Sequence, residues 1–198
     1  MYKNISGVIL AGGENKRFGG QPKSKSVIGG KTIISRIAGT IKDIFGEIII
    51  VTNAPAEFKE FNRFRIISDL FQNTGPIGGL HAAMKTASND AVFVFGGDMP
   101  FLQKQLIINQ INIFAKEKCD ALVPQVNDFT EPLHSIYSLT ILNKLEEYLT
   151  ESGNYALREF LKRIDVKYMK LPDSDLTKRS FININYPSDL TSLDKPFL

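Results

Sequence analysis

ISGVILAGGENKRFGGQPKSKSVIGGK, residues 5–31, opens the chain with an apolar strand that runs into a glycine pair and then a cationic loop. We expect the strand, Ile5–Leu10, to be buried. Open backbone N–H groups and lysines after such a strand suit the phosphates of a nucleotide, because they neutralise the anion without a deep pocket. The stretch therefore predicts a buried strand that opens onto a phosphate-binding loop.

Length and composition favour one globular domain over residues 1–198. The chain is 43% hydrophobic and 23% charged, so neither a disordered chain nor a fibre is indicated. Its 24 cations oppose 21 carboxylates, and the excess of cations gathers in the first loop. A small anionic ligand is favoured over nucleic acid, which more often binds a basic stripe across a whole domain.

Compartment and membrane association are also constrained. Cys119 is the sole cysteine, which excludes an internal disulfide and a cysteine-based zinc site. No apolar run approaches the roughly 20 residues that span a bilayer, and the chain enters its first strand directly after residue 4, without a signal peptide. We therefore expect a cytoplasmic protein that does not bind membranes.

Short apolar runs alternate with helical segments, the pattern of repeated βαβ units on a mostly parallel sheet with helices on both faces. Strands are predicted at 5–10, 47–52, 64–68, 91–95, 120–124, 133–138, 165–171 and 181–184. Helices are predicted at 32–44, 55–61, 77–87 and 104–116, along two leucine-rich stripes over 139–149 and 157–164, and at 187–193 with Asn185 or Ser188 as the cap.

Two nucleotide-binding motifs are absent. Gly30-Lys31-Thr32 resembles the end of a Walker loop, but Lys25 stands where that loop needs a glycine, and no strand immediately precedes it. Gly12-Gly13 is followed by ENKR, so the dinucleotide-binding fingerprint G-x-G-x-x-G is missing as well.

Ligands of open α/β sheets bind beyond the carboxyl ends of the strands, so the residues that follow each strand are the candidates. Glycines at positions 12 and 13 allow the backbone to approach a nucleotide closely. Arg17 and Lys23 flank a second glycine pair and are expected to bind the phosphates. Asp98 follows an apolar strand on a tight turn, where a carboxylate suits Mg²⁺.

Further candidates follow the other strands. Asp69 is expected to hold a base or ribose, or to cap a turn. Asn53 either recognises a base edge or stabilises its own loop. Gly78 lies in the glycine-rich turn GPIGG. No catalytic histidine is required, and we expect His134 to be an ordinary strand residue, with an acceptor contact as the alternative.

Five motifs together resemble one known family. They are Leu10-Ala11-Gly12-Gly13, Arg17-Phe18-Gly19-Gly20 with Lys23, Gly75-Pro76-Ile77-Gly78-Gly79, Asp98-Met99-Pro100, and Asn183-Ile184-Asn185-Tyr186-Pro187-Ser188-Asp189-Leu190. In this order, across nearly the whole chain, they resemble the molybdenum cofactor guanylyltransferases, the MobA-type proteins. The resemblance implies a Rossmann-like, three-layer nucleotidyltransferase fold that uses GTP and Mg²⁺ to attach GMP to molybdopterin with release of pyrophosphate.

The resemblance also implies roles for individual residues. Leu10, Ala11, Gly12, Gly13 and Gly78 would contact the guanine nucleotide, Asn53 and Asp69 its base and ribose, and Lys23 its phosphates, with Arg17, Lys23 and Asp98 as the catalytic set. Asp98 would hold Mg²⁺, and Asn183 or Asn185 would approach the metal or the acceptor. The part before about residue 100 would bind the nucleotide and the part after it the acceptor.

Three alternatives stay open at this point. A cytidylyltransferase and a sugar-1-phosphate nucleotidyltransferase share the glycine loop, the lysine and the metal aspartate, although the double glycine Gly12-Gly13 looks like the guanine-using members. A non-enzymatic nucleotide-binding module would be expected to lose Lys23 or Asp98. Proteins that transfer molybdopterin, or chaperones of molybdoenzymes, are the partners that the resemblance suggests.

Overall fold

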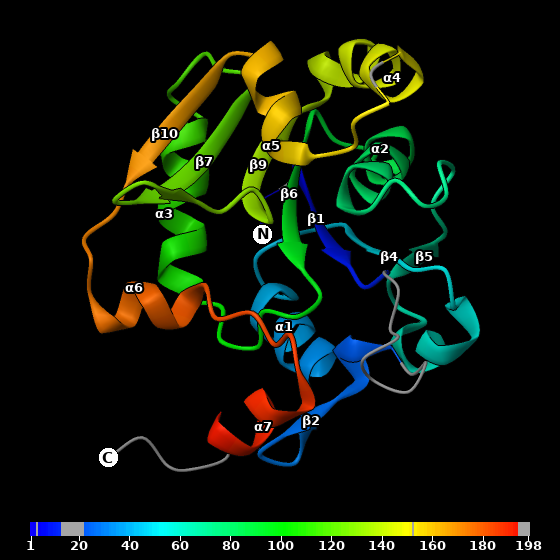
Figure 1. Cartoon of the computed structure of the whole chain (residues 1–198), viewed down its shortest axis with the longest axis vertical. Coiled ribbons are helices and arrows are strands. Elements are labelled where there is room, and N and C mark those ends of the chain that lie inside the picture. The colour runs from blue at the N-terminus through cyan, green and yellow to red at the C-terminus, as the bar shows by residue number, and fades with distance from the viewer. Residues whose placement is uncertain (3, 13–21, 152, 194–198) are drawn as a thin grey trace.

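A mixed, mostly parallel β-sheet forms the centre of the computed structural model, which describes residues 1–2, 4–12, 22–151 and 153–193 (Figure 1). Over these residues the sheet has eight strands in the order β10-β7-β9-β6-β1-β4-β5, with β8 paired to β7. Their bounds are β1 Ile5–Leu10, β4 Ile48–Val51, β5 Arg65–Ile67, β6 Ala91–Gly96, β7 Ala121–Val126, β8 Phe129–Thr130, β9 His134–Ser138 and β10 Val166–Lys170.

The carboxyl ends of the central strands form the edge of the sheet at which the sequence predicts a ligand-binding site. β1 is parallel to both β4 and β6, and β4 is parallel to β5. Leu10 at the end of β1 pairs with Gly96 at the end of β6, so the segments that follow these two strands leave the sheet at one edge. β9 is antiparallel to both β6 and β7, which makes the sheet mixed.

Helices cover both faces of the sheet, so the three-layer α/β architecture expected from the sequence is confirmed. α1 (Ile33–Ile41) and α3 (Lys104–Phe114) pack on one face, and α2 (Pro76–Thr86), α4 (Leu142–Glu151) and α5 (Leu157–Phe160) pack on the other. Side chains of β6 alternate between the two layers: Phe93 and Phe95 join the first, and Val92 and Val94 join the second. Burial on both faces explains the nearly continuous apolar run of this strand.

Short 3₁₀ helices replace some expected structure. They are η2 Lys23–Lys25, η3 Pro55–Phe61, η4 Leu139–Ile141 and η5 Leu161–Arg163. The helix predicted over 55–61 is thus a 3₁₀ helix, and it is interrupted by non-helical dihedral angles at Phe58, whose side chain is fully buried.

A small hairpin explains the glycines that resembled a Walker loop. β2 (Val27–Ile28) pairs antiparallel with β3 (Lys31–Thr32) around Gly29 and Gly30, whose φ angles are 53° and 74°. Two successive residues with positive φ favour glycine and are typical of a two-residue hairpin turn. Thr32 then caps α1 by accepting a hydrogen bond from Ser35 N at 3.3 Å.

The strand predicted over residues 181–184 is wrong. Phe181 instead ends a short helix, α6 (Asp175–Ser180), that the sequence pattern did not reveal. The residues that follow have no regular secondary structure, and Ile184 N donates to Asp98 O at 3.0 Å rather than to a sheet strand. The β-branched isoleucines favour a strand locally, whereas this contact with a distant turn decides the actual structure.

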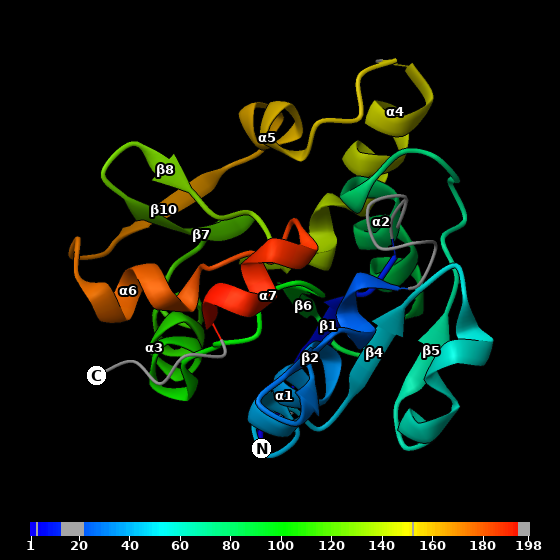
Figure 2. The ribbon, with the colours of Figure 1, turned by 60° about the horizontal axis from the view of Figure 1, so that its bottom comes forward.

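The last described helix, α7 (Pro187–Leu193), confirms the predicted element but not its cap. Asp189 accepts hydrogen bonds from Asn185 N at 2.8 Å and Tyr186 N at 2.9 Å, so a first-turn carboxylate satisfies the backbone here. α7 packs against β2 (Figure 2). The C-terminal part of the chain is thereby brought to the hairpin that follows Lys23.

Within the described residues, no helix has both the length and the apolar character needed to cross a bilayer.

Candidate functional site

Lys23 and Asp98 form the centre of the candidate site. Lys23 Nζ lies 2.6 Å from Asp98 Oδ2, although the two residues are 75 positions apart in the chain. Their side chains are 25% and 18% exposed, so a ligand can reach both. The structure therefore brings together the two residues on which the sequence-based hypothesis depends.

Close backbone packing sets the position of Asp98. Gly97 N donates to Leu10 O at 2.9 Å, which ties the turn after β6 to the end of β1. A Cβ atom on Gly97 would lie 2.6 Å from Leu10 O, so a side chain here would push the two turns apart. Glycine at this position thus lets the carboxylate of Asp98 sit directly beside the strand that ends in the glycine loop.

Lys23 is held by the short 3₁₀ turn that it opens. Lys25 in the same turn forms an ion pair with Glu60, and its ammonium nitrogen lies 5.6 Å from the centre of the Phe58 ring. Lys25 N also donates to Pro22 O at 2.8 Å. Lys25 therefore anchors the turn to the η3 segment and orients Lys23 toward the sheet.

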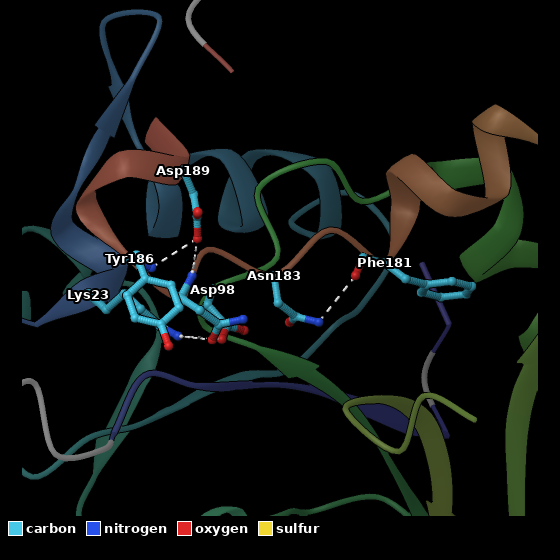
Figure 3. A network of polar contacts seen from close by, with 7 residues as sticks. Lys23, Asp98, Phe181, Asn183, Tyr186 and Asp189 are labelled. Carbon is cyan, nitrogen blue, oxygen red and sulfur yellow. Dashed lines mark hydrogen bonds and ion pairs between the residues drawn. The ribbon is translucent and has the colours of Figure 1, made fainter. Parts of the chain in front are cut away.

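The segment before α7 completes this side of the site. Asn185 Oδ1 lies 3.3 Å from Lys23 Nζ, so the ammonium group is placed between the amide oxygen and Asp98. The Asn183 side chain instead donates from Nδ2 to Phe181 O at 3.1 Å. In the view of Figure 3, Asn183 lies between Asp98 and Phe181, on the other side of Asp98 from Lys23.

Asn53 and Asp69 bind one another at the same edge, beyond β4 and β5. Asn53 Nδ2 lies 3.4 Å from Asp69 Oδ2, and Asp69 N donates to Asn53 Oδ1 at 3.3 Å. Burial raises the pKa of Asp69, and the hydrogen bond from Asn53 opposes the shift. An idealised Cβ atom on Gly12 would lie 3.9 Å from Asp69 Oδ2, so this carboxylate adjoins Gly12.

The other predicted residues differ in what the structure says of them. Leu10 and Ala11 are buried at the end of β1, where Ala11 N donates to Val51 O at 2.8 Å. A Cβ atom on Gly78 would collide with Thr74 and Phe71, so packing alone already requires this glycine. Gly13 and Arg17 lie outside the described residues.

His134 packs in the core of the protein. The His134 side chain is fully buried, and its ring makes edge-to-face contacts with Phe93, Phe95 and Phe181. Burial lowers its pKa to about 4. His134 is thus the ordinary strand residue that the sequence favoured, and the acceptor contact is excluded for this buried ring.

Sequence reasoning missed Glu131, a half-buried residue between β8 and β9. Burial raises the pKa of Glu131, and the negative charge of Asp98 raises it further. A carboxylate with such a shift near a site is a functional candidate. One sequence contains no pattern that separates Glu131 from the chain's other acidic residues.

The donor set suits a divalent cation carried by a phosphate rather than a cage of protein ligands. Among the described residues, no group of three or more His, Cys, Asp or Glu side chains could hold a metal. Mg²⁺ typically takes one or two protein oxygens and completes its shell with phosphate and water. Asp98 and Asn185 already place oxygens on both sides of the Lys23 ammonium, so the residues present fit a cation at this point.

Known proteins are similar to this chain in sequence and in fold. A family model described as the MobA-like NTP transferase domain matches residues 7–167. A "probable molybdenum cofactor guanylyltransferase" of Natranaerobius thermophilus is 34% identical over 98% of this chain and 97% of its own. A molybdenum cofactor guanylyltransferase of Desulfosudis oleivorans is 33% identical over 94% of this chain and 92% of its own.

A solved structure agrees with these relatives. The crystal structure of molybdopterin-guanine dinucleotide biosynthesis protein A from Archaeoglobus fulgidus superposes with a TM-score of 0.79 and 26% identity, over 96% of each chain. The family model spans most of the chain, and the relatives match nearly all of it above 30% identity. The chain therefore belongs to the MobA-like NTP transferase family.

Proposed function

We propose that the protein transfers GMP from GTP to molybdopterin, forming molybdopterin guanine dinucleotide and releasing pyrophosphate. The observation that carries the proposal is the 2.6 Å pairing of Lys23 with Asp98 at the carboxyl edge of the sheet. A phosphate-binding cation and a metal-binding carboxylate are the groups that nucleotidyl transfer requires side by side. The names of the relatives point to the same reaction.

The guanosine would lie over β1, β4 and β5. Its binding site would be lined by Leu10, Ala11, Gly12, Gly13 and Gly78. Asn53 and Asp69 would bind the base and ribose. A carboxylate only accepts hydrogen bonds, and guanine offers it two adjacent donors, the ring N1–H and the 2-amino group. Cytosine offers one amino group on the corresponding edge. The half-buried Asp69 carboxylate therefore favours GTP over CTP.

The chemistry would be an in-line displacement at the α-phosphorus. A phosphate oxygen of the acceptor forms the new P–O bond, while the bond from the α-phosphorus to the bridging oxygen breaks and its electron pair leaves with pyrophosphate. Because a phosphate nucleophile is already anionic at neutral pH, positioning and charge neutralisation supply most of the rate. Lys23 and Arg17 would neutralise the charge that builds on the phosphates.

A magnesium ion would be held by Asp98, with Asn185 or Asn183 as the second protein ligand. When bound, it would supply positive charge to the α-phosphoryl group and the leaving pyrophosphate. Asp98 and Lys23 would then have different roles: the carboxylate would hold the cation, and the ammonium group would contact phosphate oxygens directly.

The same proposal divides the chain by task. One domain, 1–198, would bind the nucleotide with the part before about residue 100 and the acceptor with the part after it. A cytoplasmic location is part of the proposal, since the free thiol of Cys119 suits a reducing compartment. Proteins that transfer molybdopterin, or chaperones of molybdoenzymes, would be the partners.

The deciding experiment is incubation with molybdopterin, Mg²⁺ and one of GTP, CTP, UTP or ATP, followed by release and identification of the attached nucleotide. We expect GMP from GTP alone, with loss of transfer when EDTA removes the metal. Attachment of CMP would support a cytidylyltransferase. Transfer to a sugar 1-phosphate and not to molybdopterin would support the sugar-nucleotide alternative. Binding of GTP without any transfer would leave only a nucleotide-binding module.

A further inference from the structure

Lys25 lies two residues after Lys23 in the turn η2, and the reaction described above gives it no task. Its ammonium group forms an ion pair with Glu60, and its nitrogen lies 5.6 Å from the centre of the Phe58 ring. A carboxylate and an aromatic face thus compensate the charge of Lys25, whereas Lys23 pairs with Asp98. The two lysines of one short turn therefore face different parts of the molecule.

The turn that carries both lysines is attached to two other segments. Ser26 N donates to Lys23 O at 3.0 Å, and Ser26 O accepts from Ile33 N, at the start of α1, at 2.9 Å. The attachment to α1 is thus made by the main chain. The attachment to η3 is made by the Lys25 side chain. Loss of this side chain would remove the ion pair with η3 and leave the attachment to α1 intact.

The η3 segment is itself firmly held, and it follows Asn53 closely. It begins two residues after Asn53 and buries Phe58 completely in the core layer that contains α1. Ala54 N donates to Thr52 Oγ1 at 3.2 Å, and Glu57 N donates to Ala54 O at 3.0 Å. Local hydrogen bonds therefore connect η3 to the loop that carries Asn53.

The ion pair consequently joins the two parts of the chain that would bind opposite ends of one nucleotide. Lys23 would contact the phosphates, and Asn53 with its partner Asp69 would contact the base and ribose. A ligand that binds at two points gains from both only when the spacing between the points fits the ligand. A fixed distance between η2 and η3 would preserve that spacing.

We propose that Lys25 and Glu60 are positioning residues for the nucleotide: their ion pair sets the spacing between the phosphate-binding Lys23 and the base-binding Asn53. The inference rests on the proposed function, since it needs a nucleoside triphosphate at this edge of the sheet. Lys25 and Glu60 act through the segments that they join and do not contact the ligand.

Direct phosphate binding by Lys25 is the alternative, and the two roles differ in what they predict for Glu60. If only charge mattered, Lys25→Met would weaken GTP binding, and Glu60→Met, which removes a negative charge, would strengthen it. If the pair sets a spacing, both substitutions weaken GTP binding by a similar factor. The two side chains are 26% and 51% exposed, so we expect both variants to fold.

Calorimetry on the full chain with Mg²⁺ would compare three ligands: GTP, guanosine and inorganic tripolyphosphate. We expect Lys25→Met and Glu60→Met each to raise the Kd for GTP about fivefold, a size typical of a partly exposed ion pair. The Kd values for guanosine and tripolyphosphate should change less than about twofold, because each fragment uses one end of the site only. Lys31→Met and Glu57→Met, the same changes at exposed positions of β3 and η3, serve as controls.

A double-mutant cycle tests whether the two residues act together. In a Lys25→Met background, Glu60→Met should add no further change in the Kd for GTP. Lys25→Arg, which keeps a cation for Glu60, should bind GTP nearly as well as the unsubstituted protein. Tighter GTP binding by Glu60→Met, additive effects, or an equal loss of affinity for tripolyphosphate would overturn the inference. Glu60→Met decides the matter by itself if Lys25→Met does not fold.

Failure of the proposed function has a different signature. If the unsubstituted protein binds no GTP, the proposed function and the role of the ion pair are both wrong. If it binds GTP and transfers no GMP, the proposed function is wrong, and the Kd values still decide the role of the pair. If it transfers GMP and both variants keep its Kd for GTP, only the role of the pair is wrong.

Discussion

Two half-buried carboxylates at opposite ends of the sheet differ in how their charge is compensated. Glu47, just before β4, accepts hydrogen bonds from Ser6 Oγ, from Ser88 N at 2.9 Å and from Ser88 Oγ at 3.0 Å. Burial raises its pKa, but the hydrogen bonds from Ser6 and Ser88 outweigh burial and lower it. At Glu131, beyond the carboxyl end of β6, burial prevails and the pKa is raised.

The difference separates a carboxylate that stabilises the fold from one whose charge is poorly compensated. A carboxylate with a lowered pKa stabilises the fold above its ordinary pKa, and this contribution is lost as the pH falls. A carboxylate with a raised pKa, as at Glu131 or Asp69, destabilises the folded protein at neutral pH and costs less as the pH falls. Both of these poorly compensated carboxylates lie at the carboxyl edge of the central strands, where we propose that the nucleotide binds.

Asp98→Ala should have the largest effect, and the effect should be on turnover. If this variant instead lost stability and kept its turnover, as we expect of a change at Glu47, the comparison between the two ends of the sheet would fail. We expect turnover to fall about 10³-fold, because the group that holds the metal is lost. The free energy of unfolding should change by about 1 kcal/mol or less, since the ion pair with Lys23 is partly exposed. Lys23→Ala should show the same pattern. Steady-state rates and thermal denaturation measure both quantities, with Asp128→Ala as an exposed control; unchanged turnover contradicts the assignment.

His134, a fully buried imidazole at the start of β9, extends the comparison to a basic side chain. Its folded pKa is about 4 against an ordinary 6.5, so the unfolded chain binds a proton that the folded protein excludes. The free energy of unfolding should therefore fall between pH 6.5 and about 4, by on the order of 3 kcal/mol in all. Urea denaturation across this range should show a shallower fall for His134→Phe, a change that the surrounding phenylalanines favour. Parallel curves for the two proteins would show that His134 does not carry the effect.

Glu47→Ala should affect stability and leave catalysis intact. Loss of the acceptor for Ser6 and Ser88 should lower the free energy of unfolding by about 1–3 kcal/mol. The KM for GTP and the turnover number should not change, because Glu47 lies at the amino end of the strands. Denaturant unfolding beside a transfer assay tests both parts, and Glu47→Gln should lose less stability because it keeps one acceptor oxygen. A loss of turnover without a loss of stability would remove the distinction between carboxylates at the two ends of the sheet.

Local patterns were enough to predict much of the fold. β1, β4, β5, β6, β7, β9 and β10 and the helices α1, α2 and α3 lie within a few residues of their predicted bounds. Burial on both faces leaves a continuous apolar run, and one-sided burial leaves a helical stripe, so these elements are visible in a short window. Asp98 was identifiable for the same reason, since it follows an apolar strand directly.

Contacts between distant segments cannot be predicted from such local patterns. The neighbours of Lys25 in the sequence do not indicate its ion pair with Glu60, which lies 35 positions away. The pattern over residues 181–184 predicts a strand, whereas the hydrogen bond from Ile184 N to the distant Asp98 O decides the structure of this segment. Glu131 gains its shifted pKa only after the sheet has formed, because burial and the nearby charge of Asp98 are its causes.

The amino-acid sequence alone therefore determined the alternation of strands and helices, the glycine loop and the residues that carry charge at the strand ends. Each of these follows from burial and backbone preference within a few neighbouring residues. Tertiary structure alone decided which charges meet, Lys23 with Asp98 and Asn185, and which remain poorly compensated, Glu131 and Asp69. Electrostatic and hydrogen-bond energies depend on distance and burial in space, and neither is encoded by separation along the chain.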